Sequence, residues 1–176
     1  AGALGRAGGL LMFLLDTPIV FDLRRARSPD TEQGLALWAG EVARERLFVS
    51  ALTVIELEAA ATQAARRDKA AGAALRRWID DRVIPAFDGN ILPIDTAVAQ
   101  RRGQVTLADM RDALLVATAL EHGLTLVTRN TAAFKTARVK LFDPTGYRAE
   151  EVAEDADWRT AGRDGAVWLR NLFVRS

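Results

Sequence analysis

The chain has 176 residues, of which 49% are hydrophobic, so it is long and apolar enough for one folded domain and is not a disordered protein. It contains no cysteine and a single histidine, His122, which excludes disulfides, a cysteine nucleophile and a zinc site built from several histidines. The net charge is +1, and no apolar run reaches the length of about 18 residues that a membrane-spanning helix needs, so we expect a cytoplasmic protein.

The first predicted strand is the apolar run from Met12 to Leu15, which ends in a carboxylate, Asp16. Pro18 has no N–H and cannot continue a central strand, so the strand stops there. A carboxylate at the carboxyl end of a buried parallel strand lies where open α/β sheets bind their ligands. Asp is also a preferred N-cap, so Asp16 has a structural alternative as the cap of a helix expected from Ile19.

A second strand is predicted over 47–50, after a helix expected over 35–45, and a long Ala-rich helix follows it. Thr53 and Glu56 have the spacing of a capping box, which gives Glu56 a purely structural alternative. In the functional interpretation, Glu56 lies in the first turn of a helix that begins at a strand end, on the same rim as Asp16. We expect this helix to break or kink near Gly72.

Asp112 lies at the start of an apolar helix over 113–120, which Gly123 ends as a C-terminal cap. A carboxylate in the first turn of a buried helix needs a partner, and either a metal ion or the helix N-terminus can provide one. Asp95, by contrast, is expected to act as the N-cap of a helix over 97–103.

Short strands are also predicted over 91–95, 124–128 and 139–142. Strands and helices thus alternate along the chain, which predicts an α/β/α sandwich around a parallel sheet of four to five strands. In such a sheet the strand–helix junctions share one edge, so Asp16, Glu56 and Asp112 can converge. Two carboxylates about 4 Å apart repel by roughly 4 kcal/mol at an effective dielectric near 20, and a hard cation such as Mg²⁺ or Mn²⁺ relieves that repulsion.

These motifs resemble the VapC-type, FitB-like PIN-domain ribonuclease toxins of bacterial toxin–antitoxin pairs. Each motif is short, but their order and spacing from Met12 to about Tyr147 are specific. The matching segments are Leu14–Thr17, Ser50–Glu56, Leu92–Asp95, Asp112–Ala119, His122–Asn130 and Phe142–Pro144.

The resemblance implies a PIN-like fold and a metal-dependent endoribonuclease that an antitoxin protein silences. It implies that Asp16, Glu56 and Asp112 hold Mg²⁺ or Mn²⁺ and carry catalysis. It also implies an RNA substrate and a homodimer or a toxin–antitoxin hetero-oligomer, with no membrane partner. Further residues are expected to position water or phosphate, namely Thr17, Thr128, Arg129 and Asn130.

The chain departs from the family pattern at the fourth acid, which the family carries at the position of Asn130 or of Ala133. Neither residue is acidic here, and Asp109, one turn before Asp112, is a candidate substitute. The alternative function is therefore a degenerate PIN domain that binds RNA or a protein without cleaving it. The family also has Asn where this chain has Pro18.

We divide the chain into three parts: a leader or expression remnant at 1–11, the nuclease domain at 12–147 and a partly helical C-terminal extension at 148–176. The extension begins with acidic residues and ends in an apolar helical stripe that includes Trp168 and Leu172. Two interpretations remain open for it. It either packs on the domain's own surface, or it covers the active edge of this subunit or a partner subunit and damps the activity.

Overall fold

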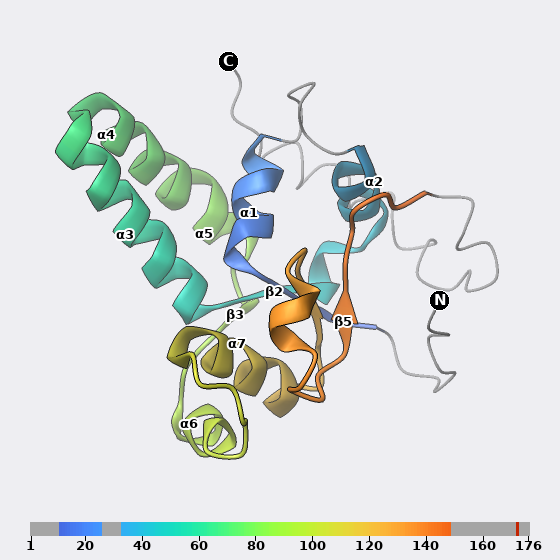
Figure 1. Cartoon of the computed structure of the whole chain (residues 1–176). Coiled ribbons are helices and arrows are strands. Elements are labelled where there is room, and N and C mark those ends of the chain that lie inside the picture. Colours follow the sequence, from blue (N-terminus) through green and yellow to red (C-terminus); the bar gives the residue numbers. More distant parts are fainter. Residues whose placement is uncertain (1–10, 26–32, 149–171, 173–176) are drawn as a thin grey trace.

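The computed structural model describes residues 11–25, 33–148 and Leu172, and its centre is a five-stranded parallel sheet (Figure 1). The strand order is β3-β2-β1-β4-β5, so the first strand of the chain lies in the middle. This confirms the predicted α/β architecture with a central parallel sheet. The strands are β1 Phe13–Leu15, β2 Leu47–Ser50, β3 Ile91–Leu92, β4 Thr125–Val127 and β5 Leu141–Phe142.

The apolar run in β1 reflects burial on both faces of the sheet. Successive side chains of a strand point to opposite faces, and here Phe13 and Leu15 belong to one hydrophobic cluster while Leu14 belongs to another. The same division separates Val127 from Leu126 in β4. A strand with two covered faces has no place for alternating polar residues, which is why the sequence shows an uninterrupted apolar run.

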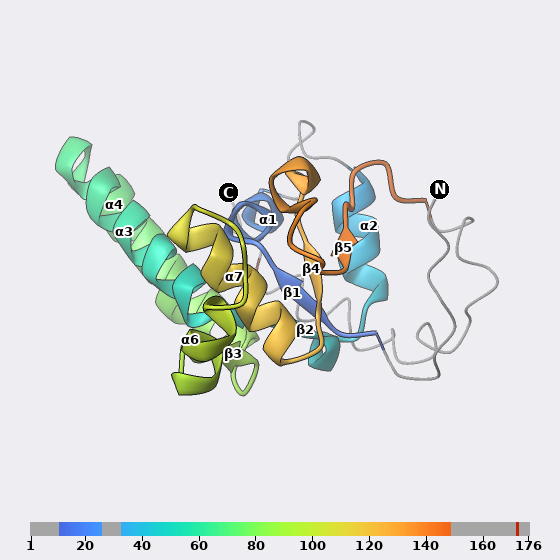
Figure 2. The same ribbon diagram turned by 60° about the horizontal axis from the view of Figure 1, so that its bottom comes forward.

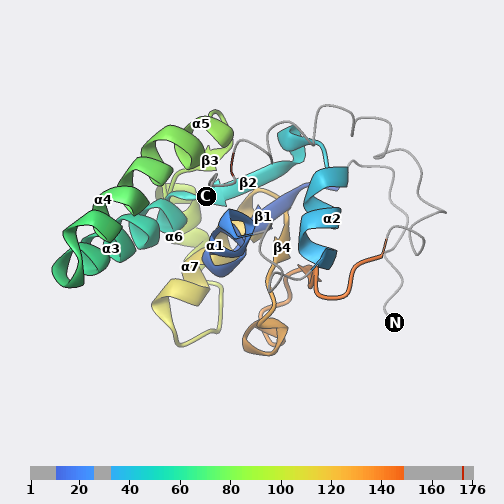
Figure 3. The same cartoon turned by 90° about the horizontal axis from the view of Figure 1, so that it is seen from above.

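Helices cover both faces of the sheet, so the predicted three-layer sandwich is present. Figures 1 and 3 show α1 and α2 on one side of the sheet, with α6 and α7 on the other. The helices are α1 Thr17–Arg24, α2 Gln33–Glu41, α3 Ala51–Arg67, α4 Lys69–Trp78, α5 Ile84–Ala86, α6 Thr96–Arg102 and α7 Met110–Glu121. Short 3₁₀ segments span Arg44–Arg46 and Thr131–Phe134, and a π segment spans Ile79–Val83.

Helices α3 and α4 form an antiparallel hairpin that projects from the sandwich as an arm (Figure 2). The break between them is at Asp68, not near Gly72 as expected from the sequence. Asp68 has an extended backbone, ends α3 and caps α4, where its carboxylate accepts the N–H of Ala70 at 2.8 Å. Gly72 instead permits close packing, because a Cβ atom there would lie 2.4 Å from the Cβ of Ala65 on the facing helix.

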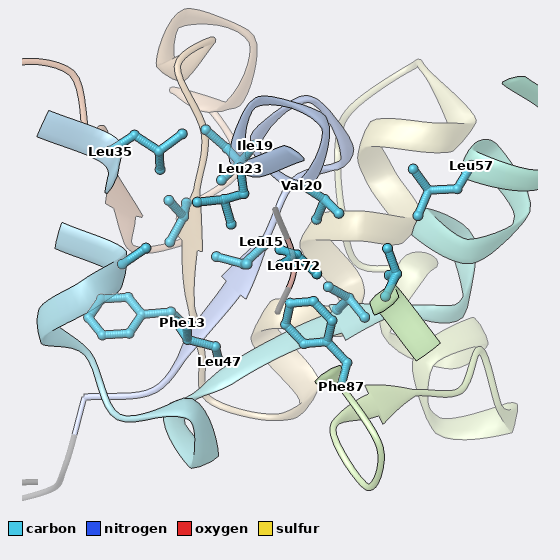
Figure 4. Close-up of a cluster of buried hydrophobic side chains, with 14 of the residues drawn as sticks. Phe13, Leu15, Ile19, Val20, Leu23, Leu35, Leu47, Leu57, Phe87 and Leu172 are labelled. Atoms are coloured by element: carbon cyan, nitrogen blue, oxygen red, sulfur yellow. The ribbon is translucent and has the colours of Figure 1, made fainter. Parts of the chain in front are cut away.

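The C-terminal extension contributes one described residue, Leu172, to the core. Its side chain is fully buried within the larger hydrophobic cluster (Figure 4). Its carbonyl accepts a 2.9 Å hydrogen bond from the indole N–H of Trp78. At Leu172, therefore, the extension packs on the domain itself. Residues 149–171 and 173–176 lie outside the described residues, and so does the predicted leader up to residue 10.

The described helices give no candidate membrane span, because none combines the length and the apolar character that crossing a membrane requires. Helix α7 packs on the sheet, and six of its residues are buried. Its predicted C-terminal cap is confirmed, since the helix finishes at Glu121 and Gly123 follows with a positive φ of 65°. Its start, at Met110, lies three residues before the predicted one.

Candidate active site

The polar residues predicted at the strand ends meet at the carboxyl edge of the sheet. Asp16 directly follows β1, and Thr128 directly follows β4, the neighbouring strand. Glu56 lies in the second turn of α3, the helix that follows β2 on the other side of β1. Asp112 comes from the first turn of α7, the helix that leads into β4. Four different segments thus supply the groups of one site.

Asp16 both caps a helix and belongs to the carboxylate cluster. It is the N-cap of α1, where its Oδ1 accepts the N–H of Thr17 at 2.8 Å, so the helix begins at Thr17 and not at Ile19. Its Oδ2 accepts a 2.8 Å hydrogen bond from the hydroxyl of Thr128. The residue is 3% exposed, so a buried carboxylate is held by donors from two separate elements.

Glu56 turns toward the site and not toward the start of its own helix, so the capping-box alternative is wrong. Helix α3 begins three residues earlier than that motif requires, because its N-cap is Ser50 and not Thr53. The Ser50 hydroxyl accepts the N–H of Leu52 at 3.1 Å. Thr53 is therefore inside the helix and buried, with its hydroxyl 3.2 Å from that of Thr17. The Thr17 hydroxyl also donates to Oε2 of Glu56.

Asp112 and Asp109 have different roles at the start of α7. Asp109 is the N-cap, and its Oδ1 accepts the N–H of Asp112 at 2.9 Å. The carboxylate considered as a substitute for the missing fourth acid therefore satisfies a helix N-terminus. Asp112 itself reaches the site through its side chain. Asp95 caps α6 by accepting the N–H of Val98 at 3.0 Å, so its structural assignment is confirmed.

Arg111 joins the three carboxylates through a single guanidinium. Its Nε donates to Oε1 of Glu56 at 2.8 Å, and its Nη1 donates to Oδ1 of Asp112 at 2.9 Å. Its Nη2 donates to Oδ1 of Asp16 and, at 3.1 Å, to Oε2 of Glu56. The sequence interpretation gave Arg111 no role, although the repulsion among three acids called for a cation and Arg111 directly precedes Asp112.

The surroundings of Arg111 keep its guanidinium charged. Burial alone lowers the pKa of Arg111, but hydrogen bonds to Glu56, Asp16 and Asp112 outweigh it and raise the pKa above its ordinary value. A divalent metal would meet the same three carboxylates, and an all-oxygen donor set suits Mg²⁺ or Mn²⁺. In the described parts of the chain no group of three acidic, His or Cys residues is arranged to hold a metal, because these carboxylates are spread around the planar guanidinium.

Two of the residues expected to position water or phosphate have other described contacts. Arg129 forms a 2.9 Å ion pair with Asp22 of α1. The backbone N–H of Asn130 donates to the hydroxyl of Thr128 at 3.2 Å, while the Asn130 residue is exposed. Thr17 and Thr128, by contrast, bind the carboxylates of the site directly. These two threonines are the expected positioning residues whose hydrogen bonds to the three acids are described.

A cavity of about 600 Å³ adjoins the carboxylates and includes side chains from α1, α3 and α7. Phe21 stands on one side of it and stacks on Trp78, with ring centroids 6.1 Å apart and planes inclined by 23°. Pro18, where the family pattern has Asn, is within the first turn of α1 and faces the same cavity. The lining residues are Thr17, Pro18, Phe21, Asp22, Arg25, Glu56 and Arg111.

The fold agrees with the comparisons to known proteins. The chain belongs to the PIN domain family, which matches residues 13–139. It is 30% identical to Toxin FitB of Neisseria gonorrhoeae over 76% of this chain and 98% of FitB. It is 28% identical to VapC ribonuclease Y4jK of Sinorhizobium fredii over 76% of this chain and 97% of that protein.

The solved structures extend the comparison to the fold. A chain in the crystal structure of FitAcB from Neisseria gonorrhoeae matches with a TM-score of 0.67 and 30% identity, over 76% of this chain and 98% of that chain. The resemblance to VapC-type, FitB-like PIN-domain toxins, stated from the motifs, is therefore confirmed.

Proposed function

We propose that the protein is a Mg²⁺- or Mn²⁺-dependent endoribonuclease that acts in the cytoplasm as the toxin of a toxin–antitoxin pair. The observation that carries the proposal is the convergence of Asp16, Glu56 and Asp112 on one cation at the carboxyl edge of a PIN-domain sheet. Three acids on one cation form an anionic site that would repel the phosphates of RNA unless a further cation intervened.

In this proposal the three carboxylates hold the metal, and the threonines hold the carboxylates. A bound divalent ion would lower the pKa of a water and stabilise negative charge on the phosphate. The hydroxyls of Thr17 and Thr128 fix Glu56 and Asp16 by hydrogen bonds. Arg129 and Asn130, at the end of β4, would contact the phosphate or a water beside it.

The proposed partners are an RNA substrate, a cognate antitoxin protein and a second copy of the chain, either as a homodimer or within a toxin–antitoxin hetero-oligomer. Similarity to Toxin FitB supports an antitoxin partner, and similarity to VapC ribonuclease Y4jK supports RNA as the substrate. A further similar structure, at 29% identity and a TM-score of 0.66, is that of FitAB bound to a DNA fragment.

The test is cleavage of a structured RNA by the full chain in Mg²⁺ and in EDTA, with Asp16→Asn beside the wild type. Asp81→Asn is the matched control, because Asp81 is an exposed acid on the π segment that follows α4. We expect cleavage by the wild type and Asp81→Asn in Mg²⁺ only, and a loss of at least about 100-fold for Asp16→Asn. Equal cleavage in EDTA, or by Asp16→Asn, would refute the proposed chemistry.

A second function is favoured by one observation, the lack of an acid at Asn130 and Ala133. The domain would then be a degenerate PIN module that binds RNA or a protein without cleaving it. Measuring RNA binding beside cleavage in the same samples separates the two functions. A binding module would retain RNA in EDTA and release no fragments in Mg²⁺, whatever residue stands at position 16.

A further inference from the structure

We infer that Arg111 and the divalent metal are mutually exclusive occupants of the carboxylate cluster, so that Arg111 is a built-in counter-cation that the metal has to displace. This inference rests on the proposed function, since it assigns the metal to Asp16, Glu56 and Asp112. It adds a regulatory contact supplied by the domain itself. The resting site is then neutralised in part by its own chain before any partner binds.

The hydrogen bonds of Arg111 engage every carboxylate that the metal would need. Each of its three nitrogens binds a carboxylate oxygen: Nε binds Glu56 at 2.8 Å, Nη1 binds Asp112 at 2.9 Å, and Nη2 binds both Asp16 and Glu56. Both oxygens of Glu56 are therefore engaged by the same guanidinium. Because like charges repel at close range, a divalent ion and the guanidinium cannot both occupy the cluster favourably.

The charge balance makes the exchange feasible. One guanidinium neutralises only one of the three negative charges, so the cluster stays anionic and attracts a second cation. A divalent ion neutralises more of that charge from a smaller volume. The side chain of Asp16 is only 5% exposed, so water screens its charge poorly. The carboxylate therefore favours a divalent ion over the guanidinium more strongly than it would at an open surface.

The backbone allows Arg111 to leave without moving Asp112. Helix α7 is fixed at its start by Asp109, which accepts the N–H of Asp112 at 2.9 Å, so the helix N-terminus does not depend on the ion pairs. The Arg111 side chain is 29% exposed and also lines the adjoining cavity with Phe21. A rotation of its long side chain into that cavity therefore releases the acids while the helix stays in place.

The experiment compares Mn²⁺ binding by the wild type and Arg111→Gln, measured by calorimetry on the full chain without RNA. We expect Arg111→Gln to bind Mn²⁺ with a Kd about tenfold lower, equivalent to about 1.4 kcal/mol, because the competing cation is gone. In EDTA we expect the variant to melt several degrees below the wild type, since three acids lose their counter-cation.

Arg101→Gln is the matched control, because Arg101 forms a 2.9 Å ion pair with Glu121 outside the carboxylate cluster. It should change neither the Mn²⁺ affinity nor the gain in melting temperature on adding Mn²⁺. Should Arg111→Gln fail to fold, Arg111→Lys decides the question. The compact ammonium of lysine cannot reach three carboxylates at once. The Kd of the Arg111→Lys variant for Mn²⁺ should therefore also fall below that of the wild type.

Unchanged or weaker Mn²⁺ binding by Arg111→Gln or Arg111→Lys, with a wild type that binds, would overturn the exchange and make Arg111 a structural support of the acids. The proposed function would survive that result. Mn²⁺ binding by neither the wild type nor the variants would overturn the exchange and the metal-dependent function together. The two failures are therefore distinguishable by the wild-type titration alone.

Discussion

At the scale of residues, the site depends on hydroxyls that hold its carboxylates. Asp16 was predicted as a site residue because it ends an apolar strand, and that argument needs only the sequence. Asp16 also accepts a hydrogen bond from Thr128. The two residues are 112 positions apart in the sequence, so no local pattern indicates that they pair. Arg111 was missed for a related reason. Helical periodicity indicates on which face of a helix a residue lies, but not where the end of a long side chain such as arginine makes its contacts.

Replacing Thr128 by Val tests the support of Asp16. The Oδ2 atom of a buried carboxylate would lose its hydroxyl donor, so we expect unfolding in urea to cost about 1–3 kcal/mol less than in the wild type. Thr118→Val is the control. The Thr118 hydroxyl donates to the carbonyl of Leu114 within α7, and without that hydroxyl the carbonyl still accepts a backbone N–H of the helix. Equal losses for both variants would contradict a special role for Thr128.

At the scale of elements, hydrophobic periodicity and the residues that end each strand predicted the sheet and α7. The position of the helix break within the Ala-rich sequence was predicted wrongly. The run after Glu56 favours helix throughout, so the sequence offered Gly72 as the natural break. The actual break depends on one side chain, Asp68, which caps α4 while ending α3. The glycine is required by the packing of two helices, which only the hairpin geometry reveals.

Replacing Gly72 by Ala tests that packing. The added Cβ would lie 2.4 Å from the Cβ of Ala65, so the helices must separate. We expect a net loss of about 1–3 kcal/mol in the free energy of unfolding, although alanine is the better helix former. Gly103→Ala should be close to neutral, because its Cβ would meet only Gln100 at 3.3 Å. A stabilised Gly72→Ala would show that the arm packs differently.

At the scale of the whole molecule, the domain closes its larger core with a residue from the C-terminal extension. Nothing in the pattern around Leu172 says which groove it fills, because helical stripes of this kind pack on many surfaces. The structure places it beside Trp78, the last residue of α4. The extension is thereby linked to the base of the arm, and removal of 148–176 should destabilise the domain.

Replacing Leu172 by Ala tests this link without a deletion. A fully buried leucine in a core costs about 2–5 kcal/mol when truncated, so the midpoint of unfolding should fall strongly. Leu37→Ala in α2, where the side chain is 42% exposed, should have a much smaller effect. Similar stability of Leu172→Ala and the wild type would show that the extension does not contribute to the core.

The central claim is that Asp16, Glu56 and Asp112 form a divalent metal site from which Arg111 is displaced. The most direct measurement is anomalous diffraction from crystals of the wild type grown with Mn²⁺. Our account predicts an anomalous peak within coordination distance of the three carboxylates, with the Arg111 guanidinium turned into the adjoining cavity. A peak at other acids, or no peak at saturating Mn²⁺ with Arg111 still paired to all three carboxylates, would contradict it.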